Sequence, residues 1–162
     1  MKALILIDIQ SGLTKKKTLF NENLFFETVN YAINVYRNSD FKVIFVQHNN
    51  NLLKNGSTGW EIDNRLDIQE NDCVIQKKHG NSFINTSLKE TLLVFGINAI
   101  TIGGLVSHGC VKATCLGGLE EGFDVSLLKN GHTNWNKDAN VKILETETEL
   151  IKRGVVIKDT IN

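Results

Sequence analysis

The sequence contains no proline, few cysteines and no excess of either charge among its 162 residues. The missing proline by itself points to no function. The three cysteines are odd in number and widely spaced, which excludes a disulfide framework and predicts a cytoplasmic location. The 18 lysine and arginine residues balance 18 aspartate and glutamate residues, and no block of like charge stands out. This balance argues against nucleic acid or an anionic membrane as a partner.

Long hydrophobic runs are also missing. The apolar run at 3–7 ends at Asp8 and is too short for a signal peptide, and no stretch is long enough to span a membrane. No internal repeat, linker or low-complexity tract divides the chain. We therefore expect a single domain over residues 1–162, a length that can bury a core without disulfides.

Apolar segments of strand length alternate with segments of helical periodicity. Strands are predicted at 3–9, 41–47, 73–76, 99–103, 123–128 and 155–157. Helices are predicted at 22–37, 86–95, 110–121 and 138–152, with loops at 11–21, 48–59, 77–83 and 130–135. Such alternation is typical of βαβ units. The expected fold class is therefore α/β, a doubly wound, mostly parallel six-stranded sheet with helices on both faces.

The stretch ITIGGLVSHGCVKAT, at 100–114, places Cys110 at the first turn of a helix that follows a strand. Backbone N–H groups and the helix dipole favour a thiolate there, so we expect a depressed thiol pKa. The carboxyl ends of parallel strands open on one edge of a sheet, and that edge also carries Asp8 and Lys77. Burial should raise the pKa of Asp8 and let it exchange a proton near neutrality, while Lys77 would stabilise both charged partners.

Each of these residues also has a plainer interpretation. Cys110 is a small residue that could simply pack a helix on a sheet, Asp8 could be structural, and Lys77 stands beside Lys78 in a pair of lysines that could be solvated. Together they supply the nucleophile, the proton acceptor and the cation of a cysteine hydrolase. The joint pattern favours this chemistry.

These segments resemble the isochorismatase-like cysteine hydrolase family over nearly the whole chain. ALILIDIQ, at 3–10, resembles the family's apolar strand ending in Asp. VIQKKHGNSF, at 74–83, resembles its strand followed by Lys, and a Phe six residues after the lysine selects Lys77 over Lys78.

Two further segments extend the resemblance. GGLVSHGCVKAT, at 103–114, resembles Gly-x-x-Thr-x-x-Cys-Val-x-x-Thr, with Ser107 in place of the usual Thr. LLKNGHTNW, at 127–135, is similar to a segment that often carries Asp where this chain has Asn130. The resemblance implies a Rossmann-like strand order and the catalytic triad Asp8, Lys77 and Cys110.

The resemblance also implies an oxyanion hole and a reaction. A cis peptide is expected at Leu105–Val106, and the N–H groups of Val106 and Cys110 would bind the oxyanion. The expected reaction is hydrolysis of an amide or related C–N bond of a small molecule through a thioester on Cys110. Three alternatives remain open: vinyl-ether hydrolysis of an isochorismate-like substrate, a thiol-redox function of Cys110, and a non-catalytic role.

One departure from the family concerns metals. Metal-dependent nicotinamidases carry an Asp-x-His pair and further histidines after the second strand, whereas QHNNNLLKN, at 47–55, offers His48 alone. A lone histidine is a poor metal site. We therefore expect neither a metal nor a nicotinamidase, and no organic cofactor.

The substrate pocket and the partners are predicted from loop positions and from the family. The side chains expected to line the pocket are Gln10, His48, Asn49, Trp60, Phe83, Ser107, His108 and Trp135. Cys73 and Cys115 are expected to be buried packing residues. The expected partners are a small-molecule substrate and, because the family commonly forms oligomers, further copies of the chain.

Overall fold

A single sheet of six parallel strands, in the order β3-β2-β1-β4-β5-β6, organises the described residues. The computed structural model describes residues 1–160, and residues 161 and 162 of the expected domain lie outside the described residues. The strands are Lys2–Ile7 (β1), Lys42–His48 (β2), Cys73–Lys77 (β3), Ala99–Leu105 (β4), Asp124–Thr133 (β5) and Val156–Lys158 (β6). The predicted fold class and Rossmann-like strand order are confirmed.

Helical segments connect the strands. The α-helices are Ser11–Thr14 (α1), Glu22–Asn38 (α2), Leu88–Val94 (α3), Lys112–Glu120 (α4) and Ala139–Lys152 (α5). Two shorter segments are a 3₁₀ turn at Thr58–Trp60 (η1) and a π-helical turn at Ser107–Val111 (η2). None of the helices among residues 1–160 has both the length and the apolar character needed to cross a bilayer.

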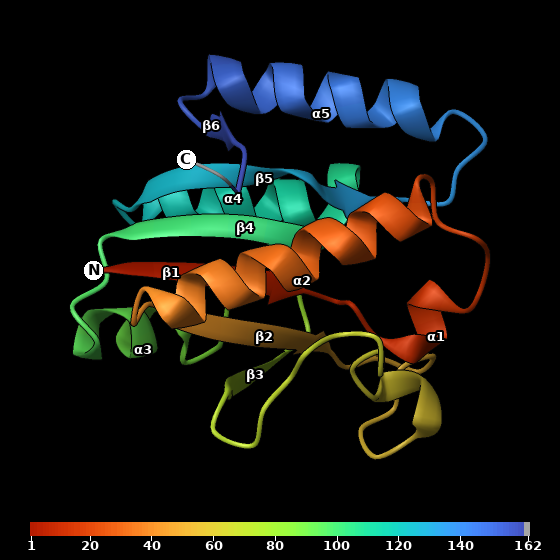
Figure 1. Ribbon diagram of the computed structural model, residues 1–162, viewed down its shortest axis with the longest axis horizontal. Helices are drawn as coiled ribbons and strands as arrows, with labels where there is room; N and C mark the ends of the chain where they lie inside the picture. Colours follow the sequence, from red (N-terminus) through yellow and green to blue (C-terminus); the bar gives the residue numbers. More distant parts are fainter. Residues whose placement is uncertain (161–162) are drawn as a thin grey trace.

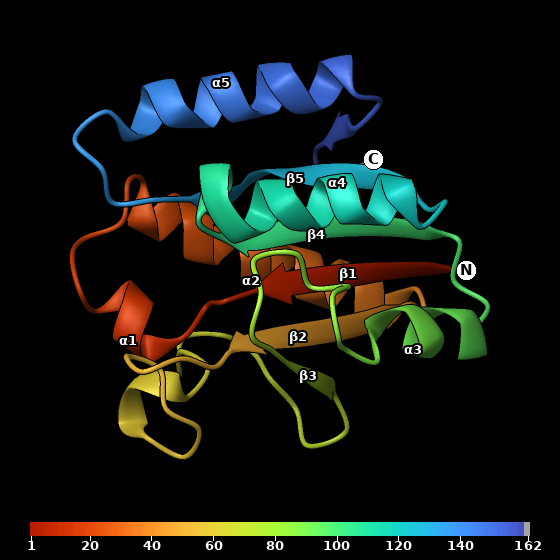
Figure 2. The ribbon, with the colours of Figure 1, turned by 180° about the vertical axis from the view of Figure 1, so that it is seen from behind.

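Helix α2 covers one face of the sheet (Figure 1), and α3 and α4 cover the other (Figure 2). Successive residues of β1 supply both apolar cores because strand side chains alternate between faces. Leu4 and Leu6 pack in the core under α2, whereas Ile5 and Ile7 pack in the core under α3 and α4. Helix α5 lies along the β5–β6 edge and also contacts α4 and η2.

Three local predictions need correction. The predicted loop at 11–21 contains helix α1. The strand expected to stop at residue 128 runs to Thr133, because β5 resumes its pairing with β4 after an irregular register between the pairs Ile102–Leu127 and Gly104–His132. The helix expected to begin at Cys110 starts as the π-helical turn η2, and regular α-helix begins only at Lys112.

The close approach of β4 to β1 explains why a glycine, Gly104, lies near the carboxyl end of β4. Gly104 has φ +121°, and a Cβ atom there would lie 2.1 Å from the carbonyl oxygen of Ile7 in β1. Only glycine fits such a backbone. The two central strands can therefore end side by side, which brings together the segments that follow them.

Candidate active site

The candidate site lies where the strand order reverses, between the carboxyl ends of β1 and β4. The strands run toward the side of the sheet on which α1 lies (Figure 1). Asp8 follows β1, Lys77 is the last residue of β3, and Cys110 lies in η2 after β4. In open α/β sheets this reversal leaves a crevice for ligands.

Asp8 is turned out of the sheet by its backbone. Its φ is 56° and its N–H donates to the carbonyl oxygen of Val46 at 2.9 Å. The carboxyl group is 3% exposed, and its Oδ1 has no hydrogen-bond partner among residues 1–160. Burial raises the pKa of Asp8 above its usual range, against the opposing charge of Lys77, as the sequence predicted.

Lys77 joins the site through its ammonium group. The side chain is fully buried, and Nζ lies 3.1 Å from Asp8 Oδ2, 3.4 Å from Cys110 Sγ and 2.6 Å from His48 Nδ1. Lys78 is exposed. The lysine that the spacing to Phe83 selected is thus the one that reaches Asp8 and Cys110.

Cys110 does not have the depressed pKa that the sequence predicted. Burial, together with the neighbouring Asp8 carboxylate, raises the pKa of its thiol to about 11, although Lys77 opposes this. The sequence argument placed Cys110 in the first turn of a regular helix, but the residue lies in the π-helical turn η2, and regular α-helix begins only at Lys112. A thiol with this pKa is protonated at neutral pH and needs a base to become nucleophilic.

His48 completes the cluster and bears on whether a metal fits. Burial and the charge of Lys77 lower the pKa of His48, so Nδ1 of its neutral ring can accept a hydrogen bond from the Lys77 ammonium. One ligand atom each from Asp8, His48 and Cys110 lie within 4.8 Å of one another, a grouping that could hold a cation. The Lys77 ammonium already contacts all three, so the residues here do not fit a metal.

The turn before Cys110 contains the expected cis peptide, at Leu105–Val106. The N–H of Val106 has no hydrogen-bond partner among residues 1–160. It is therefore free to serve as the donor that the family resemblance implies.

Several predicted pocket residues lie beside the cluster in an amide-rich network. Trp60 Nε1 and Asn49 Nδ2 both donate to Gln76 Oε1, at 3.1 and 2.6 Å. A cavity of about 410 Å³ opens next to it. Its lining is formed by Asn49, Asn55, Gln76, Lys77, Lys78, His79, Ile84 and Asn85.

Gln10 and Ser107 are too deeply buried to line a pocket. Gln10 is 0% exposed, and its amide bonds to both backbone groups of His48 and to the carbonyl oxygen of Trp60. Ser107 is also 0% exposed, with its hydroxyl 2.8 Å from His132 Nδ1. The polar groups of both side chains are thus bonded to other parts of the protein.

The remaining predicted pocket residues lie apart from the cluster. Phe83 stacks on Phe123, with ring centroids 5.8 Å apart, and packs on the core beneath α4. His108 is exposed, and Trp135 packs on the α2 side with Lys16 over its ring. Phe83 follows the loop after β3, but its apolar ring is drawn into the core instead of the site.

Sequence reasoning missed His132, which is buried and paired at both ring nitrogens. It falls in the loop predicted at 130–135, because the predicted fifth strand ends at residue 128. Had the strand been extended, His132 would have stood at a carboxyl end like Asp8 and Lys77. That position is the signal that could have identified it.

The strand order and the polar side chains at its reversal define a doubly wound α/β protein with a buried Asp-Lys-Cys cluster. A family model described as the isochorismatase domain matches residues 2–156. The chain therefore belongs to the isochorismatase family of hydrolases.

Individual relatives agree with this assignment. The isochorismatase family protein YrdC of Bacillus subtilis is 28% identical over 134 residues, which are 80% of this chain and 72% of YrdC. Streptothricin hydrolase of Streptomyces noursei is 28% identical over 88 residues, or 54% of this chain and only 32% of that protein.

Solved structures share the fold over almost the full length. The crystal structure of an isochorismatase family protein has a TM-score of 0.92 and 28% identity, covering 97% of each chain. The pyrazinamidase of Pyrococcus horikoshii in complex with zinc has a TM-score of 0.85, with 98% of each chain covered. Its identity of 20% makes this a likeness of fold alone.

Proposed function

We propose that this protein is a cysteine hydrolase that cleaves an amide or related C–N bond of a small molecule through a thioester on Cys110. The observation that carries the proposal is the position of Lys77 Nζ, 3.1 Å from Asp8 Oδ2 and 3.4 Å from Cys110 Sγ. One cation is thus shared by the proposed base and the proposed nucleophile.

The charge balance of this group suits proton transfer. A carboxylate beside a thiol and a carboxylic acid beside a thiolate both carry one negative charge, which Lys77 neutralises in either arrangement. The proton can therefore pass from Cys110 to Asp8 without leaving an uncompensated charge in a buried site. The raised pKa of Asp8 makes its carboxylate a stronger base toward the Cys110 thiol, whose own raised pKa means that it needs such a base.

The proposed reaction has two halves. Asp8 accepts the thiol proton as Cys110 Sγ attacks the substrate carbonyl, and the N–H groups of Val106 and Cys110 bind the oxyanion. Protonated Asp8 then gives its proton to the leaving nitrogen as the C–N bond breaks. Asp8 next removes a proton from water as the water oxygen attacks the thioester carbonyl. The C–S bond breaks, the carboxylic acid leaves, and Asp8 returns the proton to Cys110 Sγ.

One relative agrees with hydrolysis in general, since it is named a streptothricin hydrolase. The pyrazinamidase shares the fold alone. The zinc of that neighbour is not carried over, because Lys77 lies among the groups that would bind it. The cavity lined by Asn49, Gln76 and Lys78 is the space that we assign to the substrate, because it also reaches Lys77.

The proposal includes the setting in which the enzyme works. Its partners are a small-molecule substrate and further copies of the chain, and neither nucleic acid nor a membrane. All three cysteines are free, and a nucleophilic thiol must stay reduced, so the proposed location is the cytoplasm.

Mass spectrometry of the intact protein mixed with a library of small amides tests the proposal. An acyl adduct is expected on Cys110, and none on Cys73 or in Cys110→Ala. Turnover is expected to vanish in Cys110→Ala, while the free energy of unfolding changes by about 1 kcal/mol or less because only one sulfur is lost.

Other results would select the alternatives. Sulfenic acid or disulfide products without an acyl adduct would favour a redox function. Cleavage of a vinyl ether that persists in Cys110→Ala would favour an isochorismatase-type reaction.

A further inference from the structure

A second cluster of polar side chains lies behind the Cys110 turn. His132, near the end of β5, is 2% exposed, and both of its ring nitrogens are paired. Nδ1 lies 2.8 Å from Ser107 Oγ in η2, and Nε2 lies 3.1 Å from Glu147 Oε1 in α5. The three side chains thus form a continuous hydrogen-bonded chain, Ser107–His132–Glu147, from α5 through β5 to the turn that carries Cys110.

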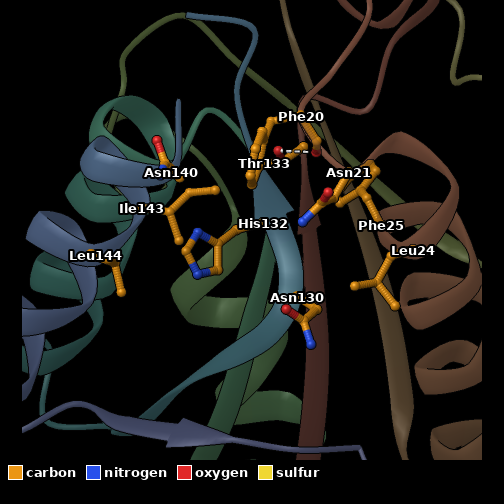
Figure 3. A pocket seen from close by; sticks show the side chains of 10 residues that line it. All are labelled: Phe20, Asn21, Leu24, Phe25, Asn130, His132, Thr133, Asn140, Ile143 and Leu144. Carbon is orange, nitrogen blue, oxygen red and sulfur yellow. Dashed lines mark hydrogen bonds between the residues drawn. The ribbon is translucent and has the colours of Figure 1, made fainter. Parts of the chain in front are cut away.

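The surroundings of the imidazole are mostly apolar. His132 forms part of the wall of a cavity of about 230 Å³, together with Phe20, Leu24 and Ile143. Figure 3 shows the ring beside Ile143 of α5, with Leu24 and Phe25 of α2 on the other side of β5. In such surroundings a hydrogen bond is stronger than in water, and an unpaired polar atom costs more.

The Glu147 carboxylate fixes the direction of one of these hydrogen bonds. The Glu147 carboxylate can only accept, so His132 Nε2 carries a hydrogen. At the other ring nitrogen, Nδ1 pairs with the Ser107 hydroxyl, which can act as donor or as acceptor. Each member therefore orients the next, and the serine at the start of η2 is held through its side chain.

A nucleophilic role for Ser107 does not fit. A serine, a histidine and a carboxylate in this order also make up the serine hydrolase triad. Ser107 is 0% exposed, however, and its hydroxyl faces His132. No substrate can reach it.

The position of Ser107 suggests another role. It follows Val106, whose N–H is the proposed oxyanion donor, and it precedes Cys110 by three residues. We propose that Ser107, His132 and Glu147 are positioning residues that hold the turn from Val106 to Cys110 in its reactive geometry. This inference rests on the proposed function, because the turn matters for rate only if Cys110 is acylated.

Two hydrogen bonds report the geometry of the turn without any substrate. The N–H groups of Gly109 and Val111 both donate to the carbonyl oxygen of Val106, at 3.0 and 3.4 Å. Amide hydrogen exchange at these two positions, followed by NMR, measures how firmly the turn is held. The amide of Ile5 in β1 serves as a control for global unfolding.

Ser107→Ala is expected to speed exchange at Gly109 and Val111 by about tenfold or more, without the same change at Ile5. Ser107→Thr keeps the hydroxyl and is expected to restore slow exchange. Should Ser107→Ala fail to fold, Glu147→Gln removes the charge from a partly exposed position and is expected to act in the same direction. Unchanged exchange at both amides, or equal acceleration at Ile5, would overturn the proposal.

Kinetics with the amide identified by adduct formation provide the second arm. The kcat is calculated per reactive Cys110, counted by titration with iodoacetamide. Ser107→Ala is expected to lower this kcat by about tenfold to a hundredfold and to leave KM nearly unchanged, because oxyanion binding acts in the transition state. Ser107→Thr is expected to recover most of this loss. Glu145→Gln, an exposed change on the same helix, is the matched control and leaves kcat unchanged.

The two arms separate the two proposals. Accelerated exchange with an unchanged kcat would overturn the positioning role. If the wild type forms no acyl adduct, the proposed function fails, and so does the catalytic role of Ser107, His132 and Glu147. The exchange measurements still decide whether these three side chains hold the turn.

Discussion

Lys77 is surrounded by acceptors that match its three ammonium hydrogens. The side chain is 0% exposed, and burying an ammonium is costly unless it is paired. Asp8 Oδ2, His48 Nδ1 and Cys110 Sγ each lie within reach of Nζ. A single buried cation therefore contacts all three neighbours, and it opposes the effect of burial on the pKa values of Asp8 and Cys110.

Replacing Lys77 by methionine, which keeps much of its volume, is expected to raise the pKa of Cys110 further, because Lys77 opposes the effect of burial. Iodoacetamide alkylation of Cys110 between pH 7 and 9 should slow by about tenfold for each unit by which the pKa rises. Lys78→Met, an exposed change, is the control. Identical pH profiles for the wild type and Lys77→Met would contradict the role.

Asp8 makes a pH-dependent contribution to stability. Its pKa is raised in the folded protein, so the native state retains a proton that the unfolded chain has released. This contribution is present below the usual pKa and is lost as the pH rises through the raised value.

We therefore expect the wild type to lose stability relative to Asp8→Asn as the pH rises from about 4 to neutrality. Urea unfolding of both proteins at several pH values measures this difference. Asp40→Asn is a matched control, since Asp40 is exposed and has a similar φ of 57°. A difference that stays constant with pH would show that the pKa of Asp8 is not raised.

At the scale of the element, the end of β4 determines where the Cys110 turn begins. Gly104 pairs with Ile7 of β1 on one side and with His132 of β5 on the other. The end of β4 thus lies between His132, which pairs with Ser107, and the segment that leads to Asp8. A shift of β4 would therefore disturb both the cluster around Asp8 and the Ser107–His132 hydrogen bond.

Gly104→Ala is expected to lower the free energy of unfolding by about 3 kcal/mol or more, because its Cβ would collide with the backbone of β1 at a positive φ. Gly56→Ala is the matched control. Gly56 also has a positive φ, +84°, but no atom lies within 4 Å of the added Cβ, so a loss of about 1 kcal/mol is expected. Equal losses in urea unfolding would show that the close approach is unimportant.

At the scale of the whole molecule, large apolar side chains remain exposed on the two longest helices. They are Leu24 and Tyr31 on α2, and Val141, Leu144 and Ile151 on α5. The homo-oligomer that the family resemblance implies stays a prediction, and such an assembly could remove some of these side chains from water.

Light scattering of the purified chain is expected to give a mass of at least twice the 18.1 kDa of one copy. A weakly associated oligomer would dissociate on dilution, and its mass would then fall toward that of one copy. A mass of 18.1 kDa at every concentration would contradict self-association.

The pattern of apolar residues was enough to predict the layers of the fold. The run at 3–7 had to be a strand buried on both faces, and the spacing in 22–37 had to be a helix, because both patterns depend only on near neighbours in sequence. The rule that parallel strands end on one edge then brought Asp8, Lys77 and Cys110 together. The motif spacing distinguished Lys77 from Lys78.

Only the tertiary structure decided the electrostatics and the supporting contacts. The pKa of Cys110 depends on how deeply the thiol is buried and on the carboxylate beside it, and neither can be read from its place along the chain. His132 bonds residues 25 positions before and 15 positions after it. Such contacts arise because β5 resumes its pairing with β4 beyond an irregular register, and register is set by packing between elements distant in sequence.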